Sequence, residues 1–415
     1  MTSDILASVD ILDEFERSNV GLDKYDLWPV LAEYRQREPV HRGDLLTEAF
    51  QQPFSIATMV AGRPAYDVLK YDDCMRVLRD TESFSNAIYR ETLEPTQGYN
   101  ILQMDAPEHR LHRAVLQSAF SRQTIDRWRS ELMEPLVNTD YIDRFGPSGR
   151  ADLMRDLALT YPVGVIHRIL GLPPERLMEL HTLAVGLLLF QTDTEVALAA
   201  SERLGELLTE YVEERRRDRG DDIISTLLHA EVEGVRLTEV EVVSFLRLLM
   251  PAGGETTTRN LASLFLALLS DREQLDLVLD RPELLPRAVE ESLRWEPPTT
   301  VQFRLCIRDT EIRGVTIPAG AAVNVWTASG SHDEDEWDEP ERFDLRREPR
   351  PHLSFAPGPH VCLGMHMARA ETVTAAAAVL TRLPNLRLDP EAETPRVHGV
   401  GFRSPATVPV VFDPV

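Results

Sequence analysis

Hydrophobic residues along the chain recur mostly at spacings of three and four positions, which is the repeat of an amphipathic helix. This pattern predicts helices over residues 163–170, 177–189, 197–217, 223–230, 285–295 and 365–380. Shorter stretches alternate apolar and polar residues between Gly or Pro, and they predict strands over 54–60, 64–69, 301–307, 311–317 and 323–327. The chain is therefore expected to be mainly α-helical with small β-sheets, an α+β fold.

The chain shows no internal repeat and no low-complexity linker across its 415 residues. A boundary between domains is normally marked by a flexible linker of that kind. We therefore expect one domain, 1–415. Its β-rich part is expected at about residues 1–80 and 300–330, and helices are expected in the remainder.

The longest predicted helix begins at Thr238 and runs to about Leu269. Thr238 and Glu241 have the spacing of a capping box, and a helix of this length would be about 45 Å long. Its middle, residues 251–257, holds one Pro, two Gly and two Thr, which are poor helix formers. A kink or a widened turn is expected there, either for packing alone or because a break in the local rule marks a functional site.

Composition narrows the classes of function. The chain has 44 Lys and Arg against 68 Asp and Glu, a net charge of −24, which disfavours nucleic-acid binding. No apolar run approaches the length of a membrane span, and the N-terminus has no signal-peptide pattern, so a cytoplasmic location is expected. Cys74, Cys306 and Cys362 form no disulfide framework and lack the spacing of a zinc or iron–sulfur site.

Cys362 stands in a turn rich in Gly and Pro, residues 355–364, directly before an Ala-rich predicted helix. A lone cysteine is most often a small buried hydrophobe. A thiolate in this place would nevertheless face a helix N-terminus, whose free N–H groups and dipole favour negative charge. A thiolate is the form that binds metals, and a single thiolate is the axial iron ligand in one class of haem proteins.

This segment resembles the cysteine-ligand loop of the cytochrome P-450 family, F-x-x-G-x-H-x-C-x-G. The matching residues are Phe355, Gly358, His360, Cys362 and Gly364. Where the family most often has Gly after the Phe, this chain has Ala356. The resemblance implies a triangular helical prism that holds haem b between the long central helix and the helix after the Cys loop. It also implies that Cys362 is the iron ligand, with Phe355, His360 and Gly364 at the cofactor.

Residues 252–257 resemble the oxygen-binding motif of the same family, in which small residues precede an acid and two threonines. The resemblance implies that Glu255 and Thr256 are catalytic, Thr256 as a hydrogen-bond partner of oxygen and Glu255 as a proton relay from solvent. Small residues, Ala252 among them, would leave room for O₂ beside the haem. Leu248, Ala252 and Thr256 lie four residues apart and share a helix face, which is expected to point at haem and substrate.

Two haem propionates need cationic or hydrogen-bonding partners when buried. The resemblance assigns this role to His109 and Arg113, four residues apart, to Arg304 in the predicted strand 301–307, and to His360. Four such groups from three distant segments would then converge on one ligand.

A Glu–Arg pair at a spacing of three residues is usually a solvated surface pair. Here Glu291 and Arg294 resemble an ion pair of the family, and Arg342 would complete a buried structural triad behind the Cys loop.

Motif alignment predicts a mostly apolar substrate pocket that suits a terpenoid, a steroid, an aromatic compound or a fatty acid. Its predicted lining residues are Leu248, Ala252, Thr299, Thr300, Gln302, Val400 and Phe402. The resemblance also implies a monomer that receives electrons from a separate ferredoxin and its reductase, without binding nucleic acid or membrane. An acidic donor would need a basic patch, with candidates Arg110, Arg113, Arg346, Arg347, Arg350 and Arg369.

Together these features predict a haem-thiolate monooxygenase that oxidises a hydrophobic small molecule with O₂ and two electrons. One alternative is a haem-binding sensor without turnover, which would not need the Glu255–Thr256 pair. Another is a peroxide-driven oxygenase, a type whose members replace that pair. Rearrangement or C–C cleavage on the same scaffold stays open.

Overall fold

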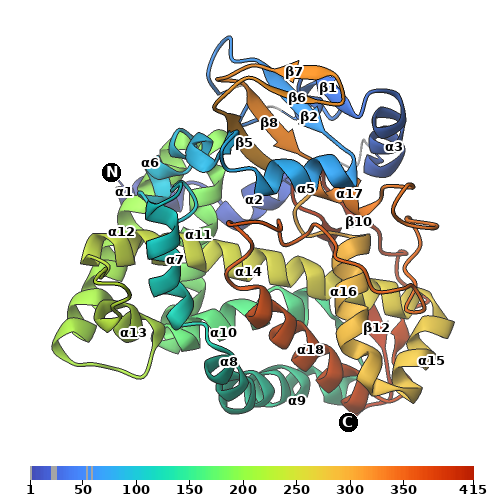
Figure 1. The fold of residues 1–415 in the computed structure, drawn as a ribbon. Coiled ribbons are helices and arrows are strands. Elements are labelled where there is room, and N and C mark those ends of the chain that lie inside the picture. Colours follow the sequence, from blue (N-terminus) through green and yellow to red (C-terminus); the bar gives the residue numbers. More distant parts are fainter. Residues whose placement is uncertain (1, 20–25, 53–54, 58) are drawn as a thin grey trace.

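The computed structural model describes residues 2–19, 26–52, 55–57 and 59–415. Helices build a broad, roughly triangular body, and the largest sheet covers one corner of it (Figure 1). The helices are α1 Thr2–Ala7, α2 Ile11–Asn19, α3 Leu27–Arg37, α4 Leu45–Glu48, α5 Tyr71–Arg79, α6 Glu94–Gln97, α7 Glu108–Ser118, α8 Arg122–Trp128, α9 Asp143–Phe145, α10 Tyr161–Ile169, α11 Leu177–Gly186, α12 Thr194–Arg217, α13 Ile223–His229, α14 Glu239–Ser270, α15 Arg272–Asp280, α16 Leu285–Trp295, α17 Thr327–Ser331 and α18 Met365–Arg382.

The strands are short. They are β1 Val40–Arg42, β2 Ala65–Val68, β3 Phe84–Ser85, β4 Arg150–Asp152, β5 Gln302–Cys306, β6 Thr310–Ile312, β7 Val315–Ile317, β8 Ala322–Val325, β9 Arg387–Leu388, β10 Val397–His398, β11 Ser404–Pro405 and β12 Pro409–Val411. The largest sheet has five strands in the order β1-β2-β8-β5-β3, in which only β2 and β8 run parallel. The α+β class predicted from the hydrophobic pattern is confirmed.

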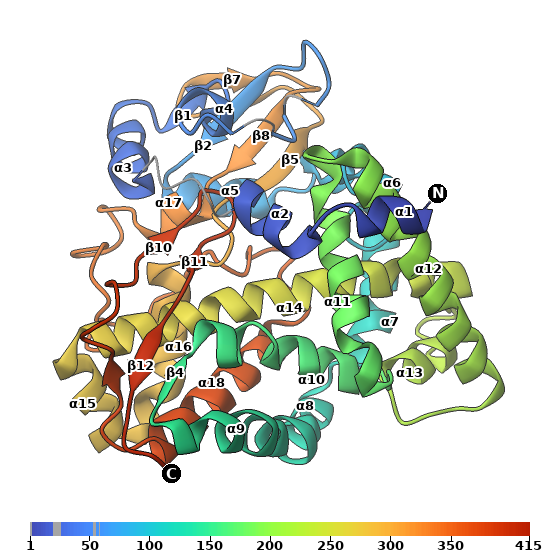
Figure 2. The same ribbon diagram turned by 180° about the vertical axis from the view of Figure 1, so that it is seen from behind.

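The central helix α14 crosses the molecule between α10 on one side and α16 and α18 on the other (Figures 1 and 2). Its predicted capping box is present, because Glu241 N donates to Thr238 Oγ1 at 3.2 Å and Thr238 N donates to Glu241 Oε2 at 2.7 Å. The helix stays α-helical for 32 residues through Pro251, so the widened turn expected there is absent. The C-terminal half of α14 is almost wholly buried and forms the middle of the main core.

The other predicted helices are also present. Residues 163–170, 197–217, 223–230, 285–295 and 365–380 correspond to α10, α12, α13, α16 and α18. The prediction over 177–189 corresponds to α11 and the 3₁₀ turn Leu187–Gln191 that continues it. Amphipathic spacing located these helices because each buries one face against a neighbour.

Predicted strands were less accurate. The stretches 64–69 and 301–307 contain β2 and β5, and the stretch 323–327 overlaps β8 but ends in the first residue of α17. The stretch 311–317 is instead a hairpin, because Arg313 and Gly314 adopt φ values of 48° and 77° and reverse the chain between β6 and β7. The strand predicted over 54–60 is wrong for its described residues, 55–57 and 59–60, which form turns and bends; residues 54 and 58 lie outside the described part.

Within the described residues, we find no helix that combines the length and the apolar character needed to span a membrane.

Candidate active site

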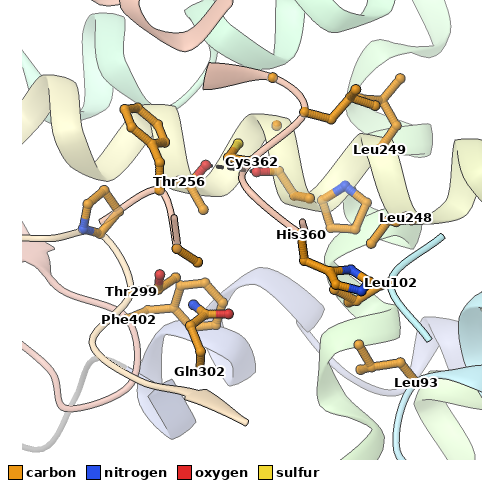
Figure 3. Close-up of a pocket in the computed structure, with 18 of the residues that line it drawn as sticks. Leu93, Leu102, Leu248, Leu249, Thr256, Thr299, Gln302, His360, Cys362 and Phe402 are labelled. Carbon is orange, nitrogen blue, oxygen red and sulfur yellow. Dashed lines mark hydrogen bonds between the residues drawn. The ribbon is translucent and has the colours of Figure 1, made fainter. Parts of the chain in front are cut away.

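A cavity of about 540 Å³ lies between α14 and the loop that leads into α18 (Figure 3). From α14 its wall includes Leu248, Ala252 and Thr256, the three residues whose spacing predicted a shared face. Cys362 lies on the loop across the cavity. The helix and the Cys loop are therefore two walls of one site. They are about a hundred residues apart in the chain.

The Cys loop is closed by a hydrogen bond in which Cys362 N donates to Phe355 O at 3.0 Å. Ala356 adopts a φ of 49°, in the left-handed region that Gly occupies without the steric cost of a Cβ. Gly358 has a φ of 148°, and a Cβ at this position would overlap the carbonyl oxygen of Leu78. The loop can therefore lie against the end of α5 only with Gly at position 358.

Cys362 presents its sulfur to the cavity. Burial raises the pKa of the thiol, although the N–H of Gly364 and the charges of Arg113 and Arg369 act in the opposite direction. The helix N-terminus alone is therefore not enough to hold a thiolate here. A metal ion would be, because coordination removes the proton of a thiol.

A cluster of nitrogen donors surrounds one end of the cavity. His109 and Arg113 from α7 and His360 from the loop all line it. The rings of His109 and His360 contact each other at a tilt of 34°, with centroids 3.8 Å apart. His109 Nε2 is buried without a hydrogen-bond partner. Burial, followed by the charge of Arg113, lowers the pKa of His109 to about 4. Burial, followed by neighbouring cationic groups, lowers the pKa of His360 to about 2.

Arg304 in β5 is fully buried and lies beside the cavity rather than in its wall. Its Nη1 donates to Phe303 O at 2.8 Å, and its charge is one of those that lower the pKa of His360. Buried cationic and unpaired polar groups require an anionic partner. A haem has two carboxylates on a flat apolar ring, so it fits this donor cluster, and Cys362 offers a ligand for its iron.

Glu255 lies next to Thr256 in sequence but not in the cavity wall. Its carboxylate is buried, with Oε2 3.1 Å from Arg259 Nη2 and Oε1 3.8 Å from His181 Nε2. Burial raises the pKa of Glu255, while Arg259 acts to lower it. Thr256 faces the cavity, and its hydroxyl donates to Ala252 O at 2.8 Å. Glu255 and Thr256 are therefore adjacent in the chain, but Glu255 is buried next to Arg259 whereas Thr256 faces the cavity.

The two glycines of the predicted oxygen motif, Gly253 and Gly254, both lie where α14 packs against α10. A Cβ on Gly253 would lie 2.5 Å from Ile166 Cδ1, and one on Gly254 would lie 3.2 Å from Val163 Cγ2, both in α10. Both glycines therefore let α10 pack closely against α14. Gly253 also lines the cavity beside Ala252, as expected for a small residue of this motif, whereas Gly254 does not.

The pocket prediction is partly wrong. Thr299, Gln302 and Phe402 line the cavity, but Thr300 and Val400 do not. Both are buried in the protein core, where the Thr300 hydroxyl donates to the Val400 carbonyl. Successive side chains of an extended segment point to opposite sides, so the bridge between Thr299 and Phe402 turns Thr300, the neighbour of Thr299, away from the cavity.

Sequence reasoning did not single out two glutamines that line the cavity. Gln97 Oε1 and Gln52 Nε2 are buried there without hydrogen-bond partners. Nothing in the local pattern marks them, because each belongs to a segment of irregular spacing and to none of the motifs.

The predicted ion triad has the wrong third member. Arg294 Nη2 lies 2.9 Å from Glu291 Oε1 as expected, and Arg347 Nε lies 3.1 Å from the same oxygen. The side chain of Arg342 is 49% exposed and lies 3.7 Å from Glu339. Arg342 contributes only its carbonyl, which accepts from Arg294 Nη2 at 3.0 Å. The chain turns after Arg342, and this turn brings Arg347 to Glu291.

The predicted basic patch is largely neutralised. Four of its six arginines contact surface or partly buried carboxylates at 2.6 to 3.3 Å, and Arg113 and Arg347 belong to the clusters described above. The four pairs are Arg110–Glu233, Arg346–Glu273, Arg350–Glu336 and Arg369–Glu290. Any acidic partner that docks here must compete with these carboxylates.

Comparisons with known proteins agree with the geometry of the site. The model of the cytochrome P-450 family matches residues 180–398. Nocardicin C N-oxygenase of Nocardia uniformis subsp. tsuyamanensis is 35% identical over 87% of this chain and 93% of its own length. Erythromycin C-12 hydroxylase of Saccharopolyspora erythraea is 36% identical over 79% of this chain and 84% of its own. CYP109E1 from Bacillus megaterium, solved in complex with testosterone, superimposes with a TM-score of 0.81 at 27% identity, covering 94% of this chain and 100% of that one.

Proposed function

Because this chain belongs to the cytochrome P-450 family, we propose that Cys362 ligates the iron of its haem and that the wall formed by α14 receives O₂ and substrate. The protein is a monooxygenase with haem b as its cofactor, and it requires O₂, a hydrophobic substrate and a source of electrons. The observation that carries the proposal is a cavity with Cys362 on one wall and Thr256 on the other.

When bound, the haem supplies the chemistry by which O₂ is reduced with two electrons, so that one oxygen atom enters the substrate and the other leaves as water. The role of the protein is to hold the cofactor and to provide protons. His109, Arg113 and His360 are the proposed partners of the propionates, because they line one end of the cavity and include an unpaired imidazole nitrogen. Arg304, which lies beside the cavity, adds its positive charge to this group.

Thr256 and Glu255 are the proposed proton donors. The Thr256 hydroxyl faces the cavity and can hold a proton at Oγ1 by giving up its bond to Ala252 O. Glu255 is a titratable group kept out of the cavity, and burial favours its protonated form. A carboxyl of raised pKa beside an alcohol on the cavity wall is suited to passing protons inward. This pair favours a monooxygenase over a sensor and over a peroxide-driven oxygenase.

The proposed substrate is a hydrophobic molecule that carries at least one hydroxyl, carbonyl or amide group. Most of the cavity lining is apolar, but Gln97 Oε1 and Gln52 Nε2 have no hydrogen-bond partner among the described residues. A purely hydrocarbon substrate would leave these groups unsatisfied, at a cost of about 1–3 kcal/mol each. Nocardicin C, erythromycin and testosterone, the molecules named for the relatives, are of this kind.

The proposed electron donor is a ferredoxin with its reductase, and the proposed location is the cytoplasm. A separate donor is what other members of the family imply. Because the proposed docking arginines are already paired with carboxylates, docking would have to exchange these ion pairs. Rising salt should then slow reduction less than it would for a free basic patch.

One experiment tests the cofactor and its ligand. The purified protein is reduced with dithionite, exposed to CO, and examined for the red-shifted Soret band of a thiolate-ligated haem. We expect the band in the wild type and in Cys306→Ser, whose sulfur lies in the core near the Arg308 carbonyl, and we expect it to be absent in Cys362→Ser. A wild type without the band, or a Cys362→Ser variant that retains it, would contradict the proposal. Candidate substrates can then be screened by the Soret shift they cause in the ferric protein.

A further inference from the structure

Arg259 in α14 is a fully buried cation that meets two carboxylates through one nitrogen atom. Its Nη2 lies 2.9 Å from Glu16 Oε1 and 3.1 Å from Glu255 Oε2. Its Nη1 donates to Ser404 Oγ at 3.0 Å. The guanidinium is therefore fixed from three directions, by α2, by its own helix and by β11.

Aromatic rings hold the same guanidinium in place. Its Cζ lies 5.5 Å from the ring centroid of Phe15 and 5.5 Å from that of Phe402. These two rings contact each other edge to face, with centroids 5.6 Å apart. Phe402 is part of the cavity wall (Figure 3), and Phe15 comes from α2. Arg259 thus contacts α2, the buried Glu255 and the wall of the substrate cavity.

The two carboxylates on Arg259 differ in their access to solvent. The side chain of Glu16 is 41% exposed, and that of Glu255 is 4% exposed. On its other oxygen Glu255 faces His181 of α11, whose Nε2 is buried without a hydrogen-bond partner. Burial lowers the pKa of His181 to about 4, so this imidazole is neutral at physiological pH. Arg259, and Glu16 through it, are therefore the charged groups that face Glu255 among the described residues.

We propose that Arg259 is a positioning residue that controls whether Glu255 carries a proton at a given pH. We also propose that Glu16 of α2, which is partly exposed, weakens this effect of Arg259. The inference rests on the proposed role of Glu255 as a proton relay. The charge of Arg259 favours the ionised form of Glu255, whereas Glu16 offsets part of that charge through the shared nitrogen. Glu16 of α2 then influences oxygen activation through Arg259 and Glu255, although α2 lies outside the cavity.

The sign of the effect follows from Coulomb's law. When Glu16 loses its charge, Arg259 acts more fully on Glu255, and the ionised carboxylate is stabilised. The pKa of Glu255 should then fall, so that less of the acid carries a proton at a given pH. Glu16→Gln suits the test because it keeps the shape of the side chain and the oxygen that contacts Arg259.

The test titrates Glu255 directly by infrared spectroscopy of the ferric holoprotein without substrate. The carbonyl-stretch band of the protonated Glu255 carboxyl is assigned by its loss in Glu255→Gln. We expect Glu16→Gln to shift the midpoint of this band downward by about one pH unit. The matched control is Glu14→Gln on the same helix, because Glu14 pairs with Arg17 at 2.7 Å and not with Arg259. An unchanged midpoint in Glu16→Gln, or an equal shift in both variants, would overturn the inference.

This measurement separates the inference from the function on which it rests. Loss of the CO band of the thiolate-ligated haem in the wild type would refute the proposed function, whatever Glu255 does. A normal CO band with no effect of Glu16 would refute only the inference. In turnover, Glu16→Gln should release more peroxide per NAD(P)H than Glu14→Gln as the pH rises, because its Glu255 loses the proton earlier. Equal peroxide yields over the whole pH range would also count against the inference.

Discussion

Glu290 on α16 holds Arg369 on α18 in a two-point contact, with Arg369 Nε 2.6 Å and Nη2 2.7 Å from the two carboxylate oxygens. The same guanidinium lies 4.6 Å from the ring centroid of Phe355, the first residue of the Cys loop. His352 Nε2 lies 3.4 Å from Glu290 on the other side. One carboxylate therefore links two helices and the entrance to the loop.

This contact predicts a pH dependence of stability. Burial raises the pKa of Glu290, but contacts with His352 and Arg369 outweigh burial and lower the pKa from its ordinary 4.5 to about 2. The folded state therefore prefers the ionised form, and its contribution to stability is complete above pH 4.5 and lost as the pH falls toward about 2. Because this side chain is 41% exposed, solvent screening reduces the contribution to about 1 kcal/mol.

We expect Glu290→Gln to lower the free energy of unfolding by that amount at neutral pH and to approach the wild type as the solution is acidified. Denaturant unfolding at a series of pH values measures this difference. Glu283→Gln, at an exposed position before α16, is the control and should follow the wild type throughout. Parallel curves for the wild type and Glu290→Gln would show that the ion pair has no part in acid stability.

The donor cluster predicts that haem retention depends on Arg113 and not on its neighbour Arg110. Arg113 lines the cavity, whereas Arg110 pairs with Glu233 at the surface at 2.8 Å. Loss of the charge that faces a buried carboxylate should weaken haem binding by about 2 kcal/mol, or roughly thirtyfold. The measurement is the rate at which haem passes from Arg113→Gln and from Arg110→Gln to excess apomyoglobin. Equal rates for the two variants would remove Arg113 from the propionate site.

The corrected ion triad predicts that Arg347→Ala is more damaging than Arg342→Ala. Arg347 donates to Glu291 Oε1 and to the carbonyls of Glu339 and Arg342. Arg294 stays paired with Glu291 when Arg347 is removed, so the cost is that of the hydrogen bonds left unmade, about 1–3 kcal/mol. Arg342 uses only its carbonyl in the cluster, so its side chain should matter by less than about 1 kcal/mol. Thermal unfolding and the haem content of the purified variants test this order. A reversed order would restore Arg342 as the third member.

The hydroxyl of Thr256 should be needed to couple electron transfer to product formation. We expect Thr256→Ala to consume NAD(P)H at a rate close to the wild type while most of the electrons appear as peroxide, because the cavity wall loses its proton-holding oxygen. The ratio of product to NAD(P)H consumed is the measurement. Thr258→Ala is the control, since its hydroxyl donates to Ala158 O at 2.8 Å away from the cavity. Full coupling in Thr256→Ala would exclude Thr256 from the relay.

Features set by spacing along one helix could be predicted from the sequence. The capping box of Thr238 and Glu241, and the shared face of Leu248, Ala252 and Thr256, follow from the fixed pitch of the α-helix. The Cys loop before α18 was recognisable because its Gly and Pro residues belong to one short segment. Strands were predicted less well, because a hairpin such as β6–β7 depends on two residues with positive φ inside an alternating pattern.

Partners that come from distant segments were decided only by the tertiary structure. Glu291 could in principle have met either Arg342 or Arg347, and the turn between them made the choice. Arg259 meets Glu16 across 243 positions of sequence, which no local pattern could indicate. The sequence by itself determined the helices, the place of Cys362 directly before α18 and the adjacency of Glu255 and Thr256, because their geometry is local. Which charges share a buried nitrogen, and which side chains face the cavity, depends on how α2, α14 and the Cys loop pack together.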